Sequence, residues 1–228
     1  MYSTDDRINK LVGEKAPITS LVMQNVIGWF EVFKNEIQKL SNRLKTDFDG
    51  KVNNVVIQYQ ERGERQFSLR VGEDLIYFHL QSNVFKLDDA HSLYRSAYLK
   101  DDPYNAYCGI ICVYNFLSDS ITKSRESDQG FLIARIFINR ENHFYVEGKK
   151  QIGLIHNDFI NDVIDANKVS DMVKTFIVFA MEHDLIPAPF DMVQSVTVSE
   201  LQSHNFSSSL ATGKSLGFRM QKDDNQSE

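Results

Sequence analysis

The densest apolar run of the chain spans residues 107–146. Nearly every residue in 110–116 is apolar or aromatic, and so is every residue in 131–138 except Arg135. Short continuous runs of this kind are typical of strands that are covered on both faces. We therefore expect this block to form the centre of a sheet, with a helix packed on each side of it.

Shorter patterns on either side of this centre predict further strands. Residues 55–59, 67–71 and 76–80 are β-rich and are separated by tight polar turns, which predicts an antiparallel meander. Residues 139–142 form a polar break before 143–146, which predicts a hairpin. Because that break contains no glycine, we expect it to be built on a type I turn.

A long helix is predicted over residues 17–45, where apolar residues recur at alternating spacings of three and four. This seam consists of Met23, Val26, Phe30, Phe33, Ile37, Leu40 and Leu44. Two interpretations remain open: the helix packs on the chain's own sheet, or the seam joins two copies of the chain. Both hold if the two halves of the helix differ in role, and the narrow seam from Phe33 to Leu44 favours the second. We also expect Gly28 to let another segment approach the helix backbone closely.

The remaining patterns complete an α+β fold. They predict an amphipathic helix over residues 88–99, a turn of helix within 157–165 and an edge strand over 192–201. A helix with a wider apolar face is predicted over 169–184, capped by Asn167 or Ser170. The predicted architecture is an antiparallel sheet of about six strands covered by the long N-terminal helix and the C-terminal helix.

The domain organisation follows from length and composition. The chain has 228 residues, of which 42% are hydrophobic and 25% charged, as in ordinary globular proteins. No linker divides it, so we expect a flexible segment at 1–16, a single α+β domain at 17–201 and a disordered tail at 202–228.

Charge and cysteines restrict the partners and the compartment. A net charge of −6 makes a nucleic-acid partner unlikely. Cys108 and Cys112 lie four residues apart, roughly 13 Å on a strand, which is too far for a disulfide. Two free thiols in apolar surroundings indicate a reducing compartment. With no secretion signal at the N-terminus and no apolar run of about 20 residues, we expect a cytoplasmic protein without a membrane association.

Two groups of residues are candidates for chemistry or binding. Asp128, Glu147 and Lys149 stand at the ends of the central hairpin and loosely resemble the carboxylate and lysine arrangement of the PD-(D/E)xK nucleases. That resemblance implies a Mg²⁺ ion and a nuclease or related hydrolase activity; a solvated turn is the alternative interpretation.

The second group lies in the irregular stretch before the central block, where aromatic residues favour binding of a protein partner or a small ligand. Its members are Tyr94, Arg95, Tyr98, Tyr104 and Tyr107.

The leading hypothesis is a non-enzymatic cytoplasmic interaction module. No catalytic group stands at the spacing of a known nucleophile or zinc motif, and we expect no cofactor in this interpretation. The heptad seam predicts a homodimer joined through the N-terminal helix. The metal-dependent hydrolase is the alternative hypothesis. Two interpretations of the tyrosines also stay open: they form a ligand-binding surface, or they cover the end of the sheet.

Overall fold

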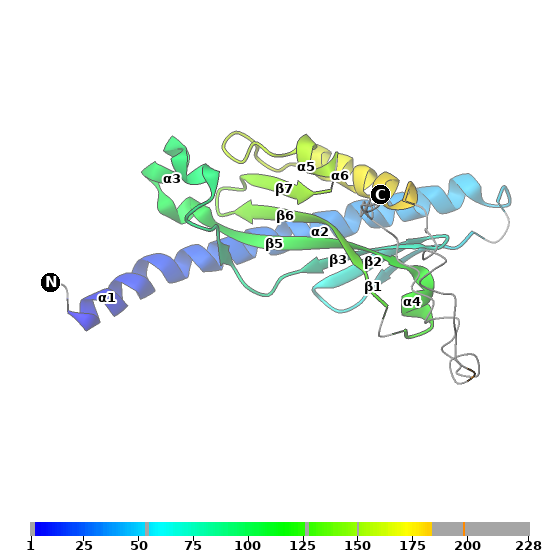
Figure 1. Cartoon of the computed structure of the whole chain (residues 1–228), viewed down its shortest axis with the longest axis horizontal. Coiled ribbons are helices and arrows are strands. Elements are labelled where there is room, and N and C mark those ends of the chain that lie inside the picture. The colour runs from blue at the N-terminus through cyan, green and yellow to red at the C-terminus, as the bar shows by residue number, and fades with distance from the viewer. Residues whose placement is uncertain (1–2, 53–54, 126–127, 150, 184–197, 199–228) are drawn as a thin grey trace, which may run out of the picture.

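The computed structural model describes residues 3–52, 55–125, 128–149, 151–183 and 198. Its centre is a seven-stranded antiparallel sheet in the order β1-β2-β3-β5-β6-β7, with the short β4 paired to β5 (Figure 1). The strands are β1 (Ile57–Glu61), β2 (Gln66–Val71), β3 (Asp74–Leu80), β4 (Phe85–Lys86), β5 (Tyr107–Leu117), β6 (Phe131–Asn139) and β7 (Phe144–Gly148). The predicted α+β class with an antiparallel sheet is confirmed.

The N-terminal helix begins much earlier than the sequence pattern predicts. α1 (Thr4–Lys10) continues through a π-helical segment (Leu11–Lys15) into α2 (Ala16–Phe48). A capping box starts it: Ser3 Oγ accepts from the Asp6 amide at 3.1 Å, and the Asp6 carboxylate accepts from the Ser3 amide at 3.0 Å. No residue of α1 is buried. The start of the helix is therefore determined by local capping and not by an apolar stripe. A prediction based on the stripe could not locate it.

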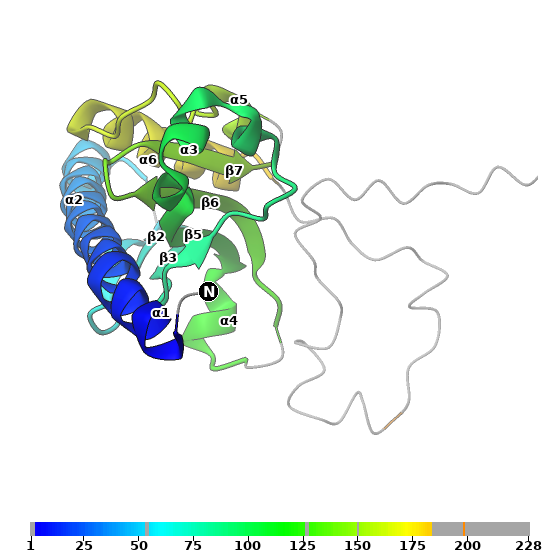
Figure 2. The ribbon, with the colours of Figure 1, turned by 90° about the vertical axis from the view of Figure 1, so that its left-hand side faces the viewer.

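Both long helices lie on the same face of the sheet, not one on each side as the sequence suggested. α2 forms an outer layer and α6 (Ala166–Met181) lies beside it (Figure 2). Ser170 of α6 donates a hydrogen bond of 2.8 Å to Glu36 of α2. A shared aromatic core lies beneath the two helices, and its rings come from Phe30, Phe33, Phe67, Phe78 and Phe176, all fully or almost fully buried. The wide apolar face of α6 and the stripe of α2 therefore share one side of the sheet.

The other face of the sheet has a smaller core of its own. Side chains alternate along β5, so Ile111 and Val113 point to the helices while Cys108 and Cys112 point to this second face. It is covered by the 3₁₀ turns Ser92–Arg95 and Pro103–Ala106, by α3 (Ala97–Asp101) and by the buried ring of Phe159.

The predicted helix over 88–99 is wrong because Ser96 has an extended backbone at φ −72° and ψ 152°. Its hydroxyl accepts a hydrogen bond from the Leu99 amide at 3.3 Å and so starts a separate short helix.

The C-terminal part of the described chain departs from prediction in its helix boundaries. α6 is capped by Asp165, whose carboxylate accepts from the Lys168 amide at 2.9 Å, and not by Asn167 or Ser170. Residues 157–165 form no helix, whereas α5 (Ile152–Ile155) does. α4 (Ser118–Thr122) follows β5 directly, in the connection that leads to β6. The predicted strand 192–201 and tail 202–228 lie outside the described residues, apart from Val198.

The turn of the central hairpin is closed by asparagines. Asn142 adopts a left-handed conformation at φ 64°, which asparagine tolerates better than most residues. Asn139 is fully buried, and its Oδ1 accepts from the amides of Glu141 and His143 at 2.9 and 3.0 Å. α2 holds the outside of the turn, where Trp29 donates 2.8 Å to Asn142 Oδ1 and Asn25 donates 2.6 Å to the Arg140 carbonyl. The tip of the hairpin is thus fixed to the long helix.

Candidate interaction surface

The seam of the long helix divides into a buried part and a partly exposed part. Val26, Phe30, Phe33 and Ile37 are fully buried in the chain's own core. Met23 and Leu40 are partly buried against that core, and Leu44 is also partly exposed. The four residues from Val26 to Ile37 therefore pack on the chain's own core, as the core-helix interpretation expects. In the last turns of α2, Leu40 and Leu44 keep part of their apolar side chains available for another contact.

An apolar groove of about 340 Å³ lies beside those last turns. α2 supplies one wall through Leu40, Leu44 and Phe48. The entry to β1 supplies Val52, Val55 and Ile57, and α6 supplies Ile177, Val178 and Met181. Two cations, Arg43 and Lys174, also line it, and Lys174 is paired with Asp171 at 3.5 Å.

Five of the apolar side chains that line this groove are more than 40% exposed. Phe48, Val178 and Met181 are 46%, 53% and 48% exposed, and Val52 and Val55 are exposed as well. Single exposed apolar residues are common, but a contiguous group lining a hollow is typical of an interaction site. The exposure arises because α2 continues to Phe48, past the Leu40 position where its stripe still packs on the core. The name apolar groove is used below for the set of apolar side chains Leu40, Leu44, Phe48, Val52, Val55, Ile57, Ile177, Val178 and Met181.

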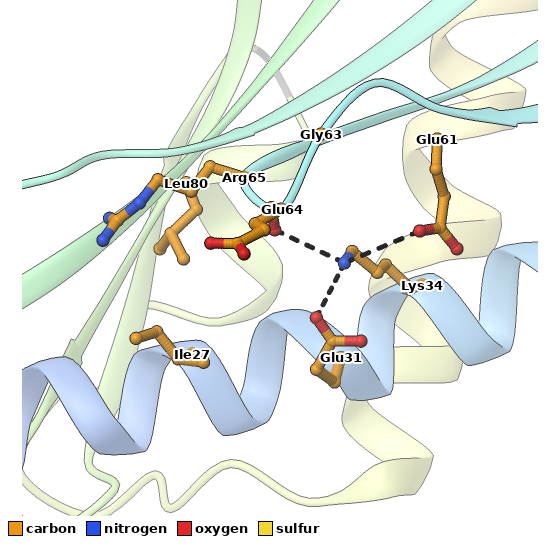
Figure 3. A pocket seen from close by; sticks show the side chains of 8 residues that line it. All are labelled: Ile27, Glu31, Lys34, Glu61, Gly63, Glu64, Arg65 and Leu80. Carbon is orange, nitrogen blue, oxygen red and sulfur yellow. Dashed lines mark hydrogen bonds and ion pairs between the residues drawn. The ribbon is translucent and has the colours of Figure 1, made fainter.

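A buried lysine lies at the opposite end of β1 (Figure 3). Lys34 is 7% exposed, and its ammonium group donates 2.7 Å to Glu31 and 3.4 Å to the Glu64 carbonyl, with Glu61 at 4.0 Å. Its Nζ also lies 5.4 Å from the centre of the Phe30 ring. The hollow around it measures about 450 Å³. Because the ammonium group already has these partners, the arrangement ties the β1–β2 turn to α2.

The tyrosine group predicted as a ligand surface is engaged within the chain. Tyr94 donates 3.2 Å to the Leu87 carbonyl, and Tyr104 donates 3.1 Å to Glu14. Tyr107 is half-buried beneath the Lys15 ammonium group, 5.5 Å from its ring centre. Two segments hold these rings, the residue Leu87 that follows β4 and the π-helical segment with Glu14 and Lys15, so all three rings have contacts within the chain. Arg95, in the same stretch, is exposed.

Tyr98 belongs to a polar network under the hairpin tip. Its hydroxyl donates 2.7 Å to Glu141 and accepts 2.8 Å from the buried Asn139. Burial, followed by the hydrogen bond to Glu141, raises the pKa of Tyr98 well above its ordinary value. Arg140 completes the network through Asn105 at 2.9 Å and an ion pair with Asp102. The neutral hydroxyl thus links α3 to the tip of the hairpin through Glu141 and Asn139.

The candidate metal residues are engaged in separate contacts. Asp128 accepts 2.7 Å from the Ser120 hydroxyl, while Glu147 is ion-paired with Arg135 on the neighbouring strand. Lys149 lies one residue beyond β7 and lines a shallow hollow with Glu147. Within residues 3–183, leaving aside the gaps, no group of three or more histidine, cysteine or carboxylate side chains could hold a metal ion. In the described geometry, Asp128 and Glu147 are thus each bound to a different partner.

The sequence pattern missed most of the groove. Its stripe ended at Leu44, while Phe48, Val52 and Val55 lie farther along the chain, and Val178 and Met181 belong to another helix. A signal was present, since apolar residues continue at Phe48, Val52 and Val55 after the predicted helix end. No family model, curated protein or solved structure matches the chain. In the described part of the chain, no helix combines the length and the apolar character needed to cross a membrane.

Proposed function

We propose that this chain is a non-enzymatic interaction module that self-associates through the apolar groove at the C-terminal end of α2. The observation that carries the proposal is the group of half-exposed apolar side chains, led by Phe48, Val178 and Met181, around a hollow of about 340 Å³. Removing apolar area from water contributes about 25 cal/mol per Å², so covering this groove favours association.

A second copy of the chain is the proposed occupant. The groove continues the seam that the sequence predicts as a helix-pair interface, since Leu40 and Leu44 belong to both. A two-fold dimer places the same surface of each copy in contact, so it covers both grooves in one step. The free thiols, buried Cys108 and Cys112, fit a reducing compartment, and we propose the cytoplasm as the place where the dimer acts.

The experiment compares charged substitutions inside and outside the groove. Phe48→Asp and Val178→Asp are expected to convert a dimer into a monomer in sedimentation velocity, because each introduces a carboxylate into the buried contact. Leu154→Asp is the matched control: Leu154 is 75% exposed on α5, away from the groove, and its substitution should leave the dimer intact. Circular dichroism of each variant checks that the fold persists.

Three results contradict the proposal. A monomeric wild-type chain at tens of micromolar removes its premise. Dimers that survive both Phe48→Asp and Val178→Asp place the contact elsewhere. Dissociation caused equally by Leu154→Asp would show that the groove has no special role.

A further inference from the structure

The two edges of the sheet differ in how they are protected. At the β7 edge, the Val146 amide donates 2.7 Å to the His156 carbonyl, and the Phe144 amide donates 3.0 Å to the Asp162 carbonyl. The Ile164 amide donates 2.9 Å back to the Asn142 carbonyl. The segment 156–164 therefore covers that edge, as natural proteins commonly do to prevent uncontrolled pairing. β1, at the other end of the sheet order, is the second edge.

The register of β1 shows which of its backbone groups face outward. Val56 accepts from the Gly72 amide at 2.8 Å, and the Arg62 amide donates 2.8 Å to Gln66. These bonds mark the even-numbered residues of β1 as the ones bonded to β2. The odd-numbered residues, Ile57, Tyr59 and Glu61, consequently point their amides and carbonyls away from the sheet. Among the described residues, only β2 pairs with β1.

We propose that β1 of a second copy pairs antiparallel with this edge, with Tyr59 of each copy on the two-fold axis. This inference rests on the self-association proposed above and specifies its geometry. Identical strands that pair antiparallel are related by a two-fold axis, so the contact closes at two copies. In the register centred on Tyr59, all three outward-facing residues form hydrogen-bonded pairs across the interface. Tyr59 pairs with the same residue of the second copy, and Ile57 of each copy pairs with Glu61 of the other.

The charges at the two ends of β1 complement this register. α2 runs antiparallel to β1, because Lys34 lies near Glu61 while Phe48 shares the groove with Ile57. The Glu61 end carries the carboxylates of Glu31, Glu61 and Glu64 together with the cations of Lys34, Arg62 and Arg65, so its formal charges balance. The Ile57 end carries Arg43 and the Lys174–Asp171 pair. Antiparallel pairing brings Glu61 of each copy to the partner's end that carries Arg43, and opposite charges that meet there favour this register.

The same pairing accounts for the exposed groove. A two-fold axis perpendicular to the sheet keeps both α2 helices on one face, side by side and antiparallel. Each groove then lies next to the partner's β1–β2 turn, which covers the part of the groove nearest β1. The result is one continuous sheet formed by two chains, with the two α2 helices paired in one layer above it. In this arrangement the α2 helices of the two copies lie next to each other, while most of the seam of each helix stays buried in its own chain.

Disulfide trapping tests this register directly. Across a hydrogen-bonded antiparallel pair the two Cα atoms lie about 5.5 Å apart, within the range that a disulfide spans. Tyr59→Cys is therefore expected to give a covalent dimer under mild oxidation in most of the protein. Glu61→Cys is the control, because the two copies of position 61 lie four residues apart in this register, roughly 13 Å along the strand. The native Cys108 and Cys112 are 0% and 3% exposed and do not compete.

A second pair of variants avoids the half-buried Tyr59. Gln58 and Gln60 are exposed, and the register places Gln58 opposite the partner's Gln60. Mixing Gln58→Cys with Gln60→Cys is expected to give a cross-linked heterodimer, and to give it several-fold faster than either protein alone. A wild-type dimer in which neither position 59 nor the 58/60 mixture cross-links would overturn the edge pairing while leaving self-association intact. Preferential cross-linking of Glu61→Cys would overturn the register, and a monomeric wild type would remove both proposals.

Discussion

Gly109 of β5 lies directly beneath Val26 of α2, so close that a methyl group on Gly109 would stand 2.5 Å from Val26 Cγ1. The absence of a side chain therefore sets how near the long helix approaches the sheet. Gly109→Ala is expected to lower the free energy of unfolding by about 1–3 kcal/mol, as overpacking of a core does. Urea denaturation followed by circular dichroism measures the change.

Gly28 provides the matched control for that substitution. The sequence pattern suggested a close approach at Gly28, but a methyl group there meets no atom within 4 Å. Gly28→Ala in an exposed helix interior is expected to stabilise the protein by about 0.5–1 kcal/mol. Opposite signs for the two alanine variants would confirm that the helix contacts the sheet at Gly109, and destabilisation by both would contradict it.

Substitutions of Lys34 separate its packing from its charge. Its side chain is 8% exposed, whereas Glu31 and Glu61 are 53% and 56% exposed, so solvent screens the ion pairs. Lys34→Met keeps an unbranched stem and is expected to change the free energy of unfolding by about 1 kcal/mol or less. Lys34→Ala loses the stem that packs beside Phe30 and should cost about 1–3 kcal/mol. Equal losses in thermal or urea unfolding would show that charge, not packing, holds the turn.

His156 makes the stability depend on pH near neutrality. Burial lowers its pKa, with Asp162 partly opposing the shift. The ring contacts Phe144 at 5.3 Å, and its Nε2 has no hydrogen-bond partner among the described residues. The unfolded chain therefore binds a proton at His156 more readily than the folded chain does. Stability is fully present above the unfolded pKa of about 6.5 and decreases as the pH falls through that value toward the folded pKa.

The corresponding measurement is the free energy of unfolding between pH 7.5 and 5. His156→Phe removes the titrating group and should flatten the decrease over that interval. Ordinary carboxylates titrate mainly below this range, with reference pKa values near 4. An unchanged slope in His156→Phe would assign the dependence to another group.

The buried thiols predict slow chemical modification. Burial strongly raises the pKa of Cys108 and so disfavours the reactive thiolate. Cys112 is 3% exposed, with its Sγ 3.6 Å from the Gln81 side-chain amide. In the native state, a thiol reagent is expected to label neither residue within minutes, and in denaturant it should label both. Rapid native labelling would show that the second face of the sheet opens readily.

Much of the sheet could be predicted because its strands differ in pattern. Phe67, Leu69 and Val71 alternate with polar neighbours, and the continuous run in 110–116 belongs to a strand covered on both faces. The N-terminal start of the helix could not be predicted from an apolar stripe, because the Ser3 capping box and not burial determines it. The side of the sheet on which each helix packs depends on tertiary contacts such as Ser170 with Glu36, which no local pattern encodes.

The candidate surface could be predicted only in part. Leu40 and Leu44 were found because they repeat at helical spacing. Val52 and Val178 reach the same hollow from a connecting segment and from another helix, and only the fold brings them together. The hairpin carboxylate Glu147 was proposed as a ligand, but its cross-strand neighbour Arg135 pairs with it, because the register places the two residues opposite each other.

Sedimentation equilibrium of the unaltered 228-residue chain under reducing conditions tests the central claim most directly. The account predicts a mass close to twice the 26.3 kDa of one chain at tens of micromolar, falling toward 26.3 kDa on dilution. A mass of 26.3 kDa at every concentration up to about a hundred micromolar would contradict it.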